Sequence, residues 1–183
     1  VQYHLTFWMS RTTPNGLAFP LATVALTHVV HGRHAYKGLA LLAATAMMLR
    51  LELVCLAVPA YLWTWWHHQR RFVYVFMTGA VTCAGSIALS VLVDSYFWRK
   101  RFLWPEGHAV IFNVIEGRSA EWGVSPPWTY VVRDLPRILF AAFPLALLGC
   151  TRRSSFRSPL VLLICTHVGL MSFLAPVSYT HLR

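Results

Sequence analysis

Long apolar runs alternate with short polar clusters along this chain of 183 residues. Runs of this kind predict membrane helices, because a helix needs about 20 apolar residues to cross a bilayer. The run at 72–93 is long enough to cross alone, and the other runs are shorter. The pattern predicts an all-α fold, a polytopic transmembrane helical bundle of about six membrane segments. These segments are 15–30, 38–49, 53–66, 72–93, 138–150 and 159–174.

Three basic clusters separate some of these runs, at 31–37, 67–71 and 151–157, and none of them contains an acidic residue. Basic connections tend to stay on the cytosolic side of a membrane. If 38–66 is a helical hairpin, all three clusters fall on one face, whereas a single long helix would divide them between two faces. The charge placement favours the hairpin. It also puts every acidic residue on the opposite, lumenal face.

The stretch 94–137 differs from its apolar surroundings and holds five of the six acidic residues. Most connections between elements are short, so a polar insert of this length indicates a function. The sequence therefore predicts membrane helices over 1–93 and 138–174, with 94–137 between them as one long lumenal loop. Aromatic residues of the same stretch also fit a belt at the membrane interface.

Composition supports the membrane interpretation. The chain is 57% hydrophobic and 12% charged, which is too apolar for an ordinary soluble domain. Its net charge of +10 lies in short connections, where membrane orientation explains it better than a nucleic-acid partner does. The four cysteines lack metal-ligand spacing, and no phosphate-binding or metallohydrolase motif occurs. We therefore predict no metal, no cofactor and no nucleic acid.

The first candidate for chemistry is the segment SRTTPN at 10–15. Proline at the first position of a helix is a start signal, so Thr12 or Thr13 is predicted to cap a helix that begins near Pro14. Arg11 would then stand at a helix N-terminus, where a cation and free backbone N–H groups can hold a phosphate. The alternative is an arginine that extends to the membrane surface beside an ordinary cap.

The second candidate is the pair Arg50 and Glu52, which lies between two apolar segments. A charge inside a membrane costs about 2.5–3.5 kcal/mol on insertion scales, so charges there tend to serve a purpose. Residues two apart do not face each other on a helix. The two side chains are therefore predicted to reach different partners or to line a cavity. The alternative is a hairpin tip that reaches water.

The third candidate is the polar stretch itself. The sequence WPEG at 104–107 is typical of a turn, and 119–127 is turn-rich with hydroxyls, a carboxylate and an indole. Sugars are bound by such mixtures of aromatic faces and polar groups. Glu106, Glu116 and Glu121 are candidates for a general base.

Several of these segments together resemble a known family. They read QYHLTFWMSRTTPN, LRLEL, DSYFWRKRFLWPEG, FNVIEGRSAEWGVSPPWTY and LPR. The chain resembles the dolichyl-phosphate-mannose-dependent mannosyltransferases of the endoplasmic reticulum, GT-C type enzymes of glycosyltransferase family 22, over about residues 2–173. Within the family it is most similar to the α-1,6-mannosyltransferases that add the eighth mannose to the lipid-linked oligosaccharide. The α-1,2-mannosyltransferases and the GPI-anchor mannosyltransferases are the alternatives.

The resemblance implies a multi-pass enzyme of the endoplasmic reticulum membrane, surrounded by its lipid. The implied donor is dolichyl-phosphate-mannose, the acceptor is a lipid-linked oligosaccharide, and the mechanism inverts the sugar without a cofactor. The acidic residue that acts as base in the family lies upstream, so no residue here is assigned as catalytic. We expect this chain to be a central fragment, inactive alone, with a non-native tail at 175–183.

The resemblance also implies roles for particular residues. Arg11 and Asn15 are expected to bind the donor phosphate, and Arg50, Glu52 and Asp94 to support the cavity. On the acceptor side we expect Glu106, Asn113, Ser119, Trp122 and Gly123. Two other classes compete with an enzyme: a transporter would spread polar residues along several helices, and a non-catalytic membrane subunit would lack a substrate-sized lumenal cavity.

Overall fold

The computed structural model describes residues 10, 12–69, 71–118, 126–151 and 159–173, and within these ranges every regular element is a helix. The prediction of an all-α fold is confirmed. The chain divides into two compact units, Val1–Ala109 and Val110–Arg183. Each of the six apolar segments coincides with one helix. These are α2 (Pro14–His31), α3 (Ala35–Met48), α4 (Val54–His67), α5 (Phe72–Trp98), α8 (Ala142–Thr151) and α9 (Pro159–Phe173).

Among the described residues, α5 alone is long and apolar enough to cross a membrane by the criteria of length and composition. Its 27 residues span about 40 Å, compared with about 30 Å for the hydrocarbon core of a bilayer. The helix continues five residues beyond the predicted end at Val93. Asp94 therefore lies inside the last turns of α5, and the prediction that it stands at the start of a loop is wrong.

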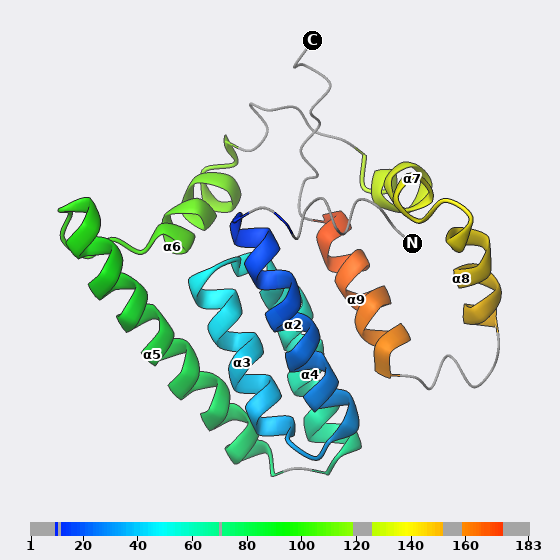
Figure 1. Ribbon diagram of the computed structural model, residues 1–183, viewed down its shortest axis with the longest axis horizontal. Helices are drawn as coiled ribbons and strands as arrows, with labels where there is room; N and C mark the ends of the chain where they lie inside the picture. The colour runs from blue at the N-terminus through cyan, green and yellow to red at the C-terminus, as the bar shows by residue number, and fades with distance from the viewer. Residues whose placement is uncertain (1–9, 11, 70, 119–125, 152–158, 174–183) are drawn as a thin grey trace. The chain divides into compact units, whose positions relative to one another are not determined.

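In the first unit, α3 lies at the centre of a helical bundle and packs against α2, α4 and α5 (Figure 1). The buried residues of α2 are mostly small, and include Ala18, Ala22 and Ala25. Helices α2 and α3 approach closely at Gly38, because a Cβ atom added there would lie 2.5 Å from the Ala25 carbonyl oxygen. Small residues at such crossings let helices approach closely without a cavity between them.

The connections from α2 to α3 and from α4 to α5 lie at the same end of this bundle (Figure 1). The His68 ring donates a hydrogen bond from Nε2 to the Val29 carbonyl oxygen over 2.9 Å. The His68 ring also lies against Gly32, which ends α2. Two of the basic clusters, 31–37 and 67–71, are thereby brought together.

At the opposite end, α3 and α4 are joined by the short 3₁₀ helix η1 (Leu51–Leu53). The region 38–66 is thus two helices that pack against each other and not one continuous helix. This connection carries the charged pair of the LRLEL segment.

The stretch 94–137 contains more helix than its sequence suggested. The segment 104–107 is not a turn, because Pro105 occupies the first position of a helix, which its fixed φ favours. The helical elements that follow α5 here are α6 (Pro105–Val110), the π-helical turns η2 (Ile111–Ile115) and η4 (Tyr130–Asp134), and α7 (Leu135–Leu139). Within the second unit, η4 packs against α7 and α9, and α7 packs against α8.

Candidate functional site

Three charged residues predicted for the site, Arg50, Glu52 and Glu106, meet at the α3–α4 connection. Arg50 Nη2 lies 2.6 Å from Glu52 Oε2 in an ion pair. The prediction that these side chains reach different partners is wrong. Arg50 has extended backbone (φ −155°, ψ 97°) and Glu52 belongs to a 3₁₀ turn, so the spacing of an α-helix does not apply. Both side chains reach solvent, and such a pair contributes about 1 kcal/mol or less to stability.

Glu106 contacts the same connection from a distant part of the chain. Its Oε2 atom accepts a hydrogen bond from the backbone N–H of Leu51 over 2.8 Å. Two residues earlier, the indole Nε1–H of Trp104 donates to the Met47 carbonyl oxygen over 3.0 Å. Met47 lies in the last turn of α3 and Leu51 begins η1, so both backbone groups belong to helix ends, which lack partners within their own helix. We refer to these two hydrogen bonds as the clasp.

The surroundings of the clasp fix the Trp104 ring. A Cβ atom added at Gly107 would overlap the indole, so the ring rests directly on the backbone of α6. The backbone N–H of Leu103 donates to Ser95 Oγ over 2.9 Å, which ties the preceding turn to the end of α5. Sequence reasoning assigned Glu106 to the acceptor side and gave Trp104 no role beyond an interfacial aromatic. Only the neighbouring glycine at 107 hinted that a large ring was accommodated there.

Asp94, the third residue expected to support the cavity, pairs along its own helix. Its Oδ2 atom accepts from Ser90 Oγ over 2.6 Å, one turn earlier on α5. Ser90 is buried and Asp94 is half-buried. The contacts described for Arg50, Glu52 and Glu106 do not include Asp94.

The start of α2 has the predicted form. Thr13 is the N-cap, and its Oγ1 accepts from the backbone N–H of Gly16 over 3.1 Å. The prediction of a threonine cap before Pro14 is confirmed. Asn15 is exposed in the first turn, which carries no acidic side chain. Arg11 lies outside the described residues.

The residues expected on the acceptor side, apart from Glu106, belong to the second unit. Asn113 is exposed on η2. Ser119, Trp122 and Gly123 lie outside the described residues, as does the candidate base Glu121. Glu116 is exposed and follows η2 directly. No group of His, Cys, Asp or Glu side chains suited to a metal ion occurs in the part of the chain that the structure describes.

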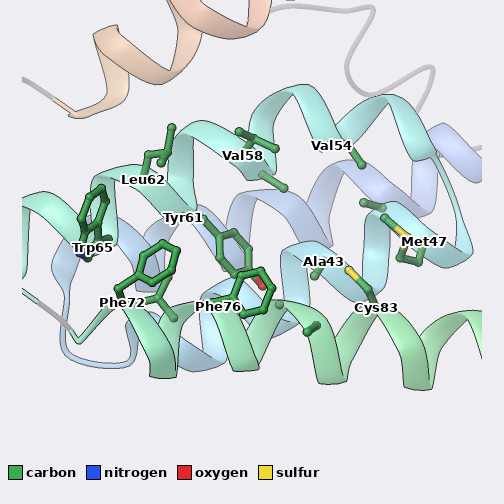
Figure 2. Close-up of a pocket in the computed structure, with 15 residues that line it drawn as sticks. Ala43, Met47, Val54, Val58, Tyr61, Leu62, Trp65, Phe72, Phe76 and Cys83 are labelled. Carbon is green, nitrogen blue, oxygen red and sulfur yellow. The ribbon is translucent and has the colours of Figure 1, made fainter.

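A groove of about 440 Å³ lies between α3, α4 and α5 in the first unit, and its lining is almost entirely apolar (Figure 2). Tyr61, Phe72 and Phe76 stand close together along it. The Tyr61 hydroxyl donates to the Leu39 carbonyl oxygen over 3.2 Å, so this polar atom is already paired. A groove of this character suits hydrocarbon and not a sugar, because burying an unpaired hydroxyl is unfavourable.

Over the ranges that the structure describes, the protein is thus helical, with a membrane-length helix and a polar connection, held by a clasp, at one end of its first bundle. The chain belongs to the Alg9-like mannosyltransferase family, which matches residues 1–176. No solved structure matches it.

Curated relatives match across much of the chain. It is 33% identical to a fission yeast protein (Schizosaccharomyces pombe) named probable Dol-P-Man:Man(7)GlcNAc(2)-PP-Dol alpha-1,6-mannosyltransferase, over 72% of this chain and 24% of that protein. A Drosophila melanogaster protein of the same name, without "probable", is 33% identical over 94% of this chain and 25% of its own length. An Arabidopsis thaliana protein with that name is 32% identical, over 81% and 30% respectively. The chain thus spans about a quarter of the length of these relatives.

Proposed function

We propose that the protein containing this chain transfers mannose from dolichyl-phosphate-mannose to a lipid-linked oligosaccharide, forming an α-1,6 linkage for protein N-glycosylation. The observation that carries this proposal is the agreement among relatives. Proteins from three distant organisms bear the α-1,6-mannosyltransferase name and match 72%, 94% and 81% of this chain.

The proposed setting is the endoplasmic reticulum membrane, crossed several times by the six apolar segments. The two ends of the first bundle differ in their acidic residues. The clusters 31–37 and 67–71 meet at one end, and Glu52 and Glu106 lie at the other. Basic connections favour the cytosolic side. On this proposal the end without carboxylates faces the cytosol, and the end with the carboxylates, which also carries Arg50 and the basic run 99–101, faces the lumen.

The proposed chemistry is an inverting transfer. A lumenal carboxylate removes the proton from the 6-hydroxyl of the acceptor mannose. The acceptor oxygen then attacks the anomeric carbon of the donor mannose. The bond between that carbon and the phosphate oxygen breaks, and dolichyl phosphate leaves with the electron pair. This base is a carboxylate other than the residues to which a role is proposed in this subsection. Arg11 and Asn15, at the start of α2, would bind the phosphate, where a cation stabilises the charge that grows on the leaving group.

The remaining residues would shape the site. Arg50, Glu52 and Asp94 are proposed to support the substrate cavity. Asn113, Ser119, Trp122 and Gly123 are proposed to face the acceptor, where an amide, a hydroxyl and an indole suit a sugar.

A transfer assay with the full-length protein tests the function. Its membranes are incubated with labelled dolichyl-phosphate-mannose and the Man7GlcNAc2 lipid. We expect a Man8 product whose new residue is released by an α-1,6-specific mannosidase. Release by an α-1,2-specific mannosidase instead would contradict the linkage. Failure of well-folded protein to transfer mannose to any lipid-linked acceptor would contradict the enzyme class.

Cysteine accessibility in sealed microsomes tests the orientation. Lys37 and Lys100 are both exposed, and each is replaced by cysteine in a variant without other cysteines. We expect a membrane-impermeant maleimide to label the cysteine at 37 in sealed vesicles, and the one at 100 only after permeabilisation. The reverse pattern would put the clasp end in the cytosol and overturn the proposed topology.

A further inference from the structure

We propose that Trp104 and Glu106 are positioning residues, which fasten the beginning of the 94–137 stretch to the α3–α4 connection. In this role Glu106 acts as a hydrogen-bond acceptor for a backbone amide, and neither as the base nor as a direct ligand of the acceptor sugar. The expected loss of mannosyl transfer rests on the proposed function, whereas the two hydrogen bonds themselves do not.

The geometry carries the proposal because two independent bonds join the same two segments. Glu106 and Leu51 are 55 residues apart in sequence, and Trp104 and Met47 are 57 apart. The chain is not α-helical between α3 and η1, and one bond lies on each side of this break. Trp104 donates to the Met47 carbonyl oxygen at the end of α3, and Glu106 accepts from the Leu51 N–H at the start of η1. Helix ends leave such groups unpaired, so each side chain meets a backbone requirement that the break itself creates.

The chemistry of the contact says which property of Glu106 matters. The Leu51 amide needs an oxygen acceptor at 2.8 Å, and the carbonyl oxygen of a side-chain amide of the same length is also an acceptor. The negative charge is therefore not essential, whereas the length of the side chain is. Aspartate keeps the charge but is one methylene shorter, so its oxygens fall short of Leu51.

The rest of the segment is built to hold these two side chains in place. Pro105 begins α6 between them, the indole rests on Gly107, and Ser95 holds Leu103 just upstream. The stretch that continues toward Asn113 thus starts from a fixed point beside the Arg50–Glu52 pair. Loosening the clasp is expected to impair transfer without touching any reacting atom.

The test is a series at one position in the full-length protein: Glu106→Gln, Glu106→Asp and Glu106→Ala, assayed with the Man7GlcNAc2 lipid. We expect Glu106→Gln to retain kcat/KM within about threefold. Glu106→Ala and Glu106→Asp are expected to lose about 10-fold to 100-fold, the range for a backbone donor that is left without its acceptor. Arg101→Ala, an exposed change in the preceding turn, is the control and is expected to have no effect.

The order of the variants separates the two roles. A base or a charge-dependent ligand would tolerate aspartate better than glutamine, and its loss would remove the acidic limb of the pH–rate profile. Positioning predicts the opposite order and an unchanged pH profile for Glu106→Gln. If Glu106→Gln is as impaired as Glu106→Ala, the proposal is overturned.

Hydrogen exchange at the Leu51 amide tests the contact without any mannosyl transfer. We expect exchange to accelerate at least about 10-fold in Glu106→Ala and to stay near the parent rate in Glu106→Gln. Trp104→Phe keeps an aromatic ring, although a smaller one, but removes the N–H donor, and is expected to accelerate exchange at the same amide. Unchanged exchange in Glu106→Ala would refute the clasp whatever the activity. Accelerated exchange in a protein that transfers no mannose would leave the clasp standing and refute the proposed function.

Discussion

Replacing Gly38 with leucine is expected to separate α2 from α3 and to leave little folded protein in the membrane. A Cβ atom at this position would lie 2.5 Å from the Ala25 carbonyl oxygen, 2.9 Å from His28 Cβ and 3.0 Å from Val29 Cγ2. The first of these is backbone and cannot rotate away, so the helices themselves must move apart. Overpacking usually costs about 1–3 kcal/mol, and we expect at least about 3 kcal/mol for four added carbon atoms at a helix crossing.

Gly85→Leu is the matched control for this prediction. Gly85 lies inside α5, and no atom is found within 4 Å of a Cβ added there. Because leucine favours a helix over glycine by almost 1 kcal/mol, this variant is expected to be neutral or slightly stabilised. Thermal unfolding of the detergent-solubilised protein, with the yield of monodisperse material, measures both variants. Equal midpoints for Gly38→Leu and Gly85→Leu would show that the α2–α3 crossing is not as tight as described.

The helices could be predicted from the sequence because their signal is local. Each of the six predicted apolar segments coincides with one helix, and the proline preceded by threonine located the start of α2. The end of α5 was misplaced because a charge was taken as the end of the run. Asp94 lies within the helix, where Ser90, one turn earlier, donates a hydrogen bond to its carboxylate.

The site was predicted less well because its contacts are not local. The spacing rule for helices put Arg50 and Glu52 on different faces. However, α3 ends at Met48, Arg50 is extended, and the two side chains pair. Glu106 was singled out for its chemistry, and nothing within its own segment shows that its partner is an amide 55 residues away. A residue pattern shows which side chains are suited to a reaction, whereas only the fold shows which of them are already engaged.

Replacing Arg11 with alanine is expected to lower kcat/KM for dolichyl-phosphate-mannose by about 10-fold to 100-fold in the full-length protein. A charge-assisted hydrogen bond to phosphate contributes about 1.5–3 kcal/mol, and the loss should appear mainly in the KM for the donor. The start of α2 supports the assignment, because its first turn carries no acidic side chain to compete with an anion. Thr13 Oγ1 already accepts from the backbone N–H of Gly16, so on this proposal a phosphate would be bound chiefly by Arg11 and Asn15.

Two companion variants separate phosphate binding from helix stability. Arg11→Lys keeps the charge but loses the planar fork of donors, so its effect on the donor KM should be intermediate. Thr13→Ala removes the cap and is expected to cost about 1 kcal/mol of stability while leaving the donor KM of the folded fraction unchanged. Titrating the donor at saturating acceptor, with thermal unfolding of each variant, distinguishes the effects. If Arg11→Ala changes only the unfolding midpoint, Arg11 stabilises the helix start, and the phosphate must be held by other residues of the full-length protein.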